Sequence, residues 1–124
     1  MPINSEFDNV YTTLRKASND IKMKCLRVDD IWEDSIIMQD IFSLIYKARI
    51  VICDCTHKNP NVFYEAGISH TLGREVILIT QSDDDIPFDL RQFRYIKYLK
   101  NSEGLDDLAK RIKERINTII IDRI

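Results

Sequence analysis

The chain has 124 residues, 44% hydrophobic and 31% charged, with a formal net charge of −2. This length suits one domain, residues 1–124, and the charge gives no electrostatic basis for binding nucleic acid or an anionic membrane. No apolar run reaches the roughly 20 residues of a membrane span, and the N-terminus lacks the apolar stretch of a secretory signal. Three cysteines without secretory features argue against a disulfide framework. We therefore expect a cytoplasmic protein.

The first half of the chain predicts a helix, a short strand and a second helix. Apolar residues within 7–17 recur at helical spacing behind a candidate cap at Ser5. A short strand is expected at 23–28 and a second amphipathic helix at 37–48.

The second half alternates apolar strands with helices. Residues 50–56 and 76–80 are nearly continuous apolar runs, which is typical of strands buried on both faces. Between them we expect a third helix from Pro60 to Leu72, ended by Gly73. An acidic turn at 82–85 precedes a last strand at 95–99. The C-terminal helix then carries one apolar stripe, formed by Leu105, Leu108, Ile112, Ile116 and Ile119.

Strands that alternate with helices predict a three-layer α/β/α domain with a parallel sheet. The strand at 50–56 is expected inside the sheet, beside the strand at 76–80. The predicted elements open on a helix, whereas a doubly wound sheet of this size should open on a central strand. Two interpretations follow: either Met1-Pro2-Ile3 is the tail of a truncated first strand that begins further upstream, or the sheet lacks this strand. Such a truncation would leave backbone edges open for pairing between chains, and we expect a homo-oligomer.

The segment from Asp54 to His70 is the candidate functional site. Ligands of open α/β sheets bind beyond the carboxyl ends of the strands, and Asp54 lies near such an end. Asn59 and Pro60 form a favourable helix start. At 100° per residue, Glu65 falls within the apolar side of that helix, which comprises Val62, Ala66, Ile68 and Leu72. A glutamate that faces the sheet indicates a function.

Each of these features also has a structural interpretation. A glutamate near a helix start often complements the helix dipole or closes a cap, and an aspartate at a strand end commonly caps a turn. Cys53, Cys55 and His57 share one strand face and could ligate a metal, although buried strand cysteines are more often small apolar residues. The chain has no glycine-rich phosphate loop, so a phosphate would bind near Ser5. We predict no metal and no cofactor.

The candidate segment resembles a known sequence block. It reads Asp54-Cys-Thr-His-Lys-Asn-Pro-Asn-Val-Phe-Tyr-Glu-Ala-Gly-Ile-Ser-His70, followed by Leu72-Gly73. This is similar to the Asp-Leu-Thr…Asn-Pro-Asn-Val-Phe-Tyr-Glu-Leu-Gly block of nucleoside 2-deoxyribosyltransferase-like proteins. Bacterial Toll/interleukin-1 receptor-like nucleotide-binding domains carry the same block. Asp85-Ile-Pro-Phe-Asp-Leu-Arg91 resembles a second block of this group.

The resemblance implies a flavodoxin-like fold and chemistry at an N-glycosidic bond. Glu65 matches the family's nucleophile, which attacks the anomeric carbon and forms a covalent glycosyl ester. Asp54 is the candidate to assist the leaving base. The candidate substrate-binding residues are Asn59, Asn61, Tyr64 and Ser5. The sequence departs from the block at Cys55, where leucine is usual, and at His57-Lys58, where Gly-Arg is common.

Two classes of function are compatible with this sequence. The first is an enzyme that acts on a nucleoside, a nucleotide or NAD, either by deoxyribosyl transfer or by glycohydrolysis. The alternative is a non-catalytic nucleotide-binding or signalling module, for example in a bacterial defence system. A further form of this alternative is a Toll-like domain that works through self-association. We expect a nucleoside, a nucleotide or NAD as the small-molecule partner.

Overall fold

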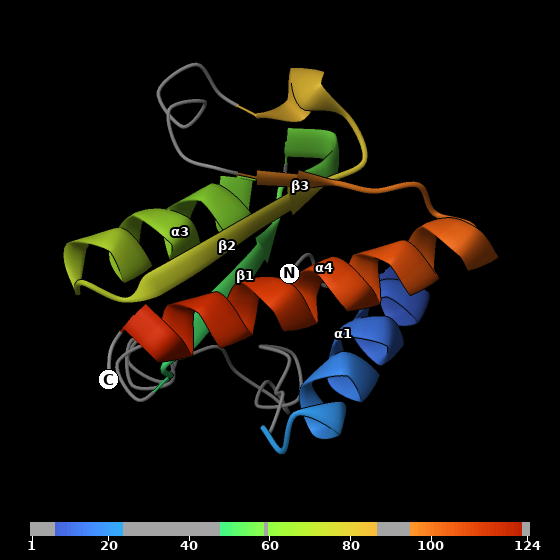
Figure 1. The fold of residues 1–124 in the computed structure, drawn as a ribbon. Helices are drawn as coiled ribbons and strands as arrows, with labels where there is room; N and C mark the ends of the chain where they lie inside the picture. The colour runs from blue at the N-terminus through green and yellow to red at the C-terminus, as the bar shows by residue number, and fades with distance from the viewer. Residues whose placement is uncertain (1–6, 24–47, 59, 87–94, 123–124) are drawn as a thin grey trace, which may run out of the picture.

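The computed structural model describes residues 7–23, 48–58, 60–86 and 95–122, except the side chains of Asn61 and Asp122. In chain order, the elements are α1 (Asp8–Asp20), β1 (Ile50–Asp54), the 3₁₀ turn η3 (Thr56–Lys58), α3 (Pro60–Thr71), β2 (Glu75–Thr80), the 3₁₀ turn η4 (Asp83–Asp85), β3 (Tyr95–Lys97) and α4 (Ser102–Asp122). Strands and helices alternate along the chain, which confirms the predicted α/β class (Figure 1).

The strands form a parallel sheet in the order β1-β2-β3. Ile50 of β1 lies opposite Glu75, and Leu78 of β2 lies opposite Tyr95. Because all three strands run in one direction, their carboxyl ends share one edge of the sheet, where η3 and η4 follow β1 and β2 (Figure 1). The predicted parallel pairing of the two apolar runs is confirmed.

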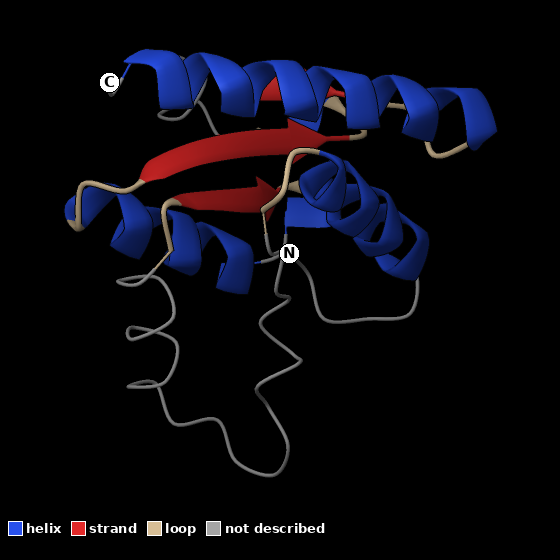
Figure 2. Ribbon diagram, turned by 60° about the horizontal axis from the view of Figure 1, so that its bottom comes forward, coloured by secondary structure: helices blue, strands red, loops and turns tan. Residues whose placement is uncertain are grey.

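Two hydrophobic cores cover the two faces of the sheet. On one face, α1 and α4 pack over all three strands, and on the other face α3 packs over β1 and β2. Figure 2 shows the strands with helices on both sides. This arrangement of three layers follows from strands that are apolar on both sides, because each face must be covered by an amphipathic helix.

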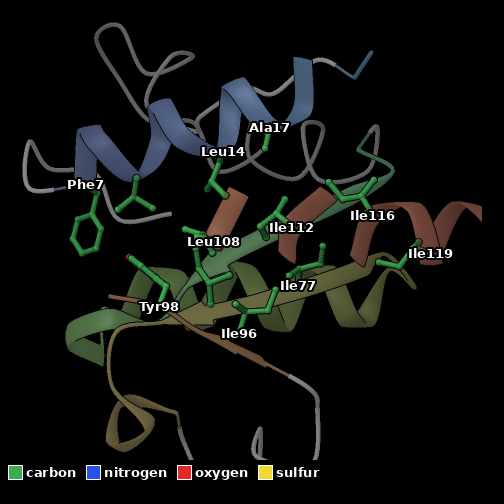
Figure 3. Close-up of a cluster of buried hydrophobic side chains, with 12 residues drawn as sticks. Phe7, Leu14, Ala17, Ile77, Ile96, Tyr98, Leu108, Ile112, Ile116 and Ile119 are labelled. Atoms are coloured by element: carbon green, nitrogen blue, oxygen red, sulfur yellow. The ribbon is translucent and has the colours of Figure 1, made fainter. Parts of the chain in front are cut away.

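The larger core lies between α1, α4 and the sheet. Figure 3 shows Leu14 of α1, Ile112 of α4 and Ile77 of β2 gathered in this layer. The predicted stripe of α4 is buried at Leu108, Ile112, Ile116 and Ile119, and Leu105 is half-buried against the same cluster. The spacing of apolar residues in α1 and in α4 therefore predicted which face of each helix is buried.

The buried side of α3 differs in part from the predicted one. Val62 and Ala66 are buried as expected, but Leu72 is 37% exposed and Ser69 is fully buried in its place. The Ser69 hydroxyl donates a 2.7 Å hydrogen bond to the Glu65 carbonyl, so a polar residue can be buried here without an unsatisfied group. The expectation that Leu72 faces the core was wrong.

Gly73 ends α3 as predicted. Its φ of +71° lies in the left-handed region. Its N–H bonds to the His70 carbonyl, and the Arg74 N–H bonds to the Ser69 carbonyl. These two bonds form a Schellman motif, which favours glycine at this position.

The start of α1 differs from the expected cap. The helix begins at Asp8, and Phe7 occupies the cap position without a side-chain cap bond. Phe7 is buried in the larger core, so burial of its ring fixes this end of the helix. Ser5 lies outside the described residues.

Several other predicted features also lie outside the described residues. They are the first-strand tail Met1-Pro2-Ile3, nearly all of the strand at 23–28 and of the helix at 37–48, and Asn59. The predicted position of β1 inside the sheet is not tested by the described residues, in which β1 pairs with β2. Within the described part of the chain, β2 is the central strand.

Replacement of Gly104 by alanine is expected to destabilise the fold. A Cβ at this position would lie 2.0 Å from the Leu99 carbonyl oxygen, so the first turn of α4 must shift. We expect a loss of about 1–3 kcal/mol in the free energy of unfolding, measured by urea denaturation. Gly67→Ala is the matched control, because a Cβ there meets nothing within 4 Å. That helical substitution should be neutral or stabilising, and equal losses in both variants would contradict the prediction.

Candidate functional site

The candidate site lies at the carboxyl edge of the sheet. Asp54 is the last residue of β1, and its side chain is 0% exposed. Backbone bonds extend the sheet pairing just past the strand ends, from the Cys55 N–H to the Ile79 carbonyl and from the Tyr98 N–H to the Thr80 carbonyl. Residues that follow β1, β2 and β3 are thereby brought together.

Asp54 is the centre of a hydrogen-bond network at this edge. Its Oδ1 accepts bonds from the Thr56 N–H at 3.0 Å and the Thr56 hydroxyl at 2.6 Å. Its Oδ2 accepts a bond from the Tyr98 hydroxyl. Gln81 closes the network, because its N–H donates to the Thr56 hydroxyl oxygen and its Nε2 donates to the Tyr98 hydroxyl oxygen. The network therefore ties together the segments that follow all three strands.

The surroundings of Asp54 act on its pKa in two directions. Burial raises the pKa of the carboxyl above its ordinary value of 3.8, and this is the largest effect. The hydrogen bonds from Thr56 and Tyr98 favour the charged form and lower the pKa in part. A buried carboxylate with three donors is well suited to fix the ends of strands.

Glu65 lies in the second turn of α3 and faces the sheet. Its residue exposure is 6%, and the buried Val62 and Ala66 share its side of the helix. Burial raises the pKa of the Glu65 carboxyl above its ordinary value of 4.5. Burial is the largest effect on this carboxyl, so it determines the direction of the shift. The prediction that Glu65 faces the sheet and is buried is therefore confirmed.

The two candidate carboxylates lie on opposite faces of the sheet. Cys53 packs in the core beneath α3, and Glu65 contributes to raising the pKa of that thiol, which burial brings to about 12. Side chains alternate along a strand, so Asp54 points to the other face, where its partner Tyr98 belongs to the α1–α4 core. The structure thus does not place these two residues around one small group on one face.

The turn η3 has an unusual backbone. His57 and Lys58 have φ values of 67° and 56°, both in the left-handed region. Each such non-glycine residue costs roughly 1–2 kcal/mol, and residues in strained conformations cluster at functional sites. The His57 N–H donates a 2.8 Å bond to Asp85 Oδ2 of η4, and the His57 ring meets Phe7 edge-on at 6.2 Å. These contacts hold the turn that leads to α3.

The candidate metal ligands separate in the structure. Cys53 and Cys55 are buried together under α3, and burial raises the pKa of each thiol to about 12. His57 is exposed, and its ring lies against Phe7 of the opposite core. The two cysteines therefore behave as the small apolar residues of the alternative interpretation.

The four predicted substrate-binding residues do not form a group within the described structure. Tyr64 is 55% exposed on α3, Asn61 has a helical backbone in the first turn of α3, and Ser5 and Asn59 lie outside the described residues. Two open hollows are lined by described residues, one of about 590 Å³ where β3 leads into α4 and one of about 330 Å³ between β3 and α4. Neither is lined by Glu65 or Asp54.

Three residues of this edge were not identified as site residues from the sequence. Tyr98 and Gln81 complete the Asp54 network, and Asp85 holds the η3 turn. The available signal was positional, because Gln81 directly follows the predicted strand at 76–80 and Tyr98 lies within the predicted strand at 95–99. Their partners are distant in sequence, 44 positions for the Tyr98–Asp54 bond and 25 positions for the Gln81–Thr56 bond, so these contacts depend on the packed sheet.

Tyr98→Phe is expected to destabilise the protein by about 1–3 kcal/mol, because it leaves a buried Asp54 oxygen without its donor. Urea denaturation at neutral pH measures this loss. Tyr95→Phe is the control, since the Tyr95 hydroxyl bonds to Asp83 at an exposed position, where changes are usually within about 0.5 kcal/mol. An equal effect of both variants would show that the Tyr98–Asp54 bond contributes little.

Comparisons of the chain with protein-family models, with curated proteins and with solved structures found no match. Among the described helices, none has the length and apolar character needed to cross a membrane.

Proposed function

We propose that the protein acts on the N-glycosidic bond of a nucleoside, a nucleotide or NAD, with Glu65 as the nucleophile. The observation that carries this proposal is a 6% exposed glutamate on the sheet-facing side of α3. A carboxylate in such a place loses hydration, so the fold bears a cost that a solubilising glutamate would avoid. The resemblance of residues 54–73 to the deoxyribosyltransferase block supports the same residue.

The proposed reaction has two steps. The Glu65 carboxylate attacks the anomeric carbon, the carbon–nitrogen bond breaks, and the base leaves with the electron pair. A purine or pyrimidine takes up a proton as it leaves, whereas the nicotinamide of NAD leaves as a neutral molecule without one. Water or a second base then attacks the glycosyl ester and releases the carboxylate. We further propose that the whole chain adopts a flavodoxin-like doubly wound fold, with which the three-stranded parallel sheet is compatible.

One observation favours a second candidate function, a nucleotide-binding or signalling module without turnover. Asp54, the implied assistant of the leaving base, is engaged by three donors and faces away from the α3 side of the sheet. A site with a nucleophile but no matched acid would bind a nucleotide more readily than cleave it.

Base release separates the two candidate functions. The purified protein is incubated with nucleosides, 2-deoxynucleosides, nucleotides and NAD, and free base is measured by chromatography. A second, labelled base distinguishes transfer from hydrolysis. The nucleophile proposal requires release that Glu65→Gln abolishes and Glu114→Gln preserves, because Glu114 is exposed on α4. Binding of a nucleotide, measured by calorimetry, without release of base would support the module. If the protein shows no binding and no release, both functions are excluded.

A further inference from the structure

The acidic turn η4 contacts the turn that connects β1 to α3. Asp85 Oδ2 accepts a 2.8 Å hydrogen bond from the His57 N–H, across 28 positions of sequence. We infer that Asp85 is a positioning residue that holds this connection and thereby the start of the helix that carries Glu65. This inference rests on the proposed function for its catalytic consequence, whereas the contact itself can be tested independently.

The η3 turn needs an external contact to keep its conformation. His57 and Lys58 are consecutive left-handed residues without glycine. Within the turn, the Lys58 N–H bonds to the Cys55 carbonyl at 3.0 Å. A charged acceptor forms a stronger bond to a backbone N–H than a neutral one does, so the Asp85 carboxylate is suited to stabilise the turn. Without it, we expect the backbone to relax toward ordinary φ values.

Asp85 is itself fixed relative to α3. The Ser82 hydroxyl oxygen accepts a bond from the Asp84 N–H, and the Asp85 N–H bonds to the Ser82 carbonyl. Ile86, the next residue, is 1% exposed and packs in the core that contains Val62 and Ala66 of α3. Since Glu65 shares that side of α3, Asp85 links the η3 turn to the same packed unit as Glu65.

The first test measures amide hydrogen exchange in the η3 turn and in the first two turns of α3. In Asp85→Ala we expect exchange to become about tenfold faster or more, because the turn loses its holding contact. Asp84→Ala is the matched control, since Asp84 is exposed and its side chain forms no bond within the described structure. Asp85→Asn keeps an acceptor oxygen and should be intermediate. Equal exchange in the two alanine variants overturns the inference.

A second substitution separates positioning from a general loss of stability. His57→Gly, introduced into Asp85→Ala, should restore slow exchange in α3, because glycine adopts a left-handed conformation without a holding contact. If α3 exchanges as fast in the double variant as in Asp85→Ala, Asp85 does not act through the backbone of this turn.

The catalytic consequence is read from base release. We expect Asp85→Ala to lower kcat about tenfold or more, with Asp84→Ala at the level of the unchanged protein and the His57→Gly double variant partly restored. Faster exchange with unchanged kcat overturns the positioning role. If the unchanged protein releases no base from any substrate, the proposed enzyme function fails, while the exchange experiment still decides whether Asp85 holds the turn.

Discussion

Glu65→Gln is expected to lower base release by several orders of magnitude while the fold is kept. Glutamine has the shape of glutamate but cannot form the glycosyl ester, so the variant loses the step on which the proposed reaction depends. Circular dichroism and the denaturation midpoint establish that the variant folds. Unchanged release in a folded variant would exclude Glu65 as the nucleophile.

Glu65→Gln is expected to keep or raise the stability of the fold, although it lowers activity. Burial raises the folded-state pKa of Glu65 above its ordinary value of 4.5, so the folded protein binds this proton more tightly than the unfolded chain does. Its contribution to the free energy of unfolding therefore decreases as pH rises from below about 4.5 through the folded pKa. Above that pH, Glu65→Gln should be at least as stable as the unchanged protein. At low pH the two should become alike.

The raised pKa also predicts the pH dependence of the reaction. Only the ionised carboxylate can attack, so base release should increase with pH along a limb whose apparent pKa lies above 4.5. A pH series of kcat/KM for the unchanged protein measures this limb. A limb at or below 4.5 would mean that the reacting group is not a buried carboxyl.

Much of the fold could be predicted from the sequence because a few signals are strong. The apolar runs at 50–56 and 76–80 contain strands that pair in parallel, since continuous apolarity requires cover on both faces. The stripe of α4 was found because its apolar residues, from Leu105 to Ile119, keep helical spacing over about four turns. Glu65 was found in the same way, as a charge on the apolar side of a helix.

Other features needed the packed structure. Ser69 is buried where Leu72 was expected, because its hydroxyl bonds within the helix and the last turn of α3 is less covered than its centre. The left-handed turn at His57 carries no glycine, so its sequence does not indicate its conformation. The deoxyribosyltransferase block that this segment resembles commonly has Gly-Arg at these two positions. The opposite faces of Asp54 and Glu65 could have been deduced from the alternation of β1, given that Cys53 packs toward α3.

Asp54→Ala is expected to be among the most destabilising single changes at this edge. It removes the acceptor of the Thr56 N–H, the Thr56 hydroxyl and the Tyr98 hydroxyl at a fully buried position. Each buried donor left unsatisfied costs about 1–3 kcal/mol, so we expect a total loss on the order of 3 kcal/mol. Asp54→Asn keeps an acceptor for Thr56 and should lose less.

The pH profile of these variants shows whether Asp54 has a structural or a chemical role. Because burial raises its folded-state pKa above 3.8, its contribution to stability decreases as pH rises from below about 3.8 through the folded pKa, and Asp54→Asn should lack this slope. Since Asp54 faces away from the α3 side of the sheet, we expect Asp54→Asn to reduce base release much less than Glu65→Gln does. Equal reductions in two well-folded variants would show that Asp54 takes part in the reaction, and that the network with Thr56 and Tyr98 rearranges when substrate binds.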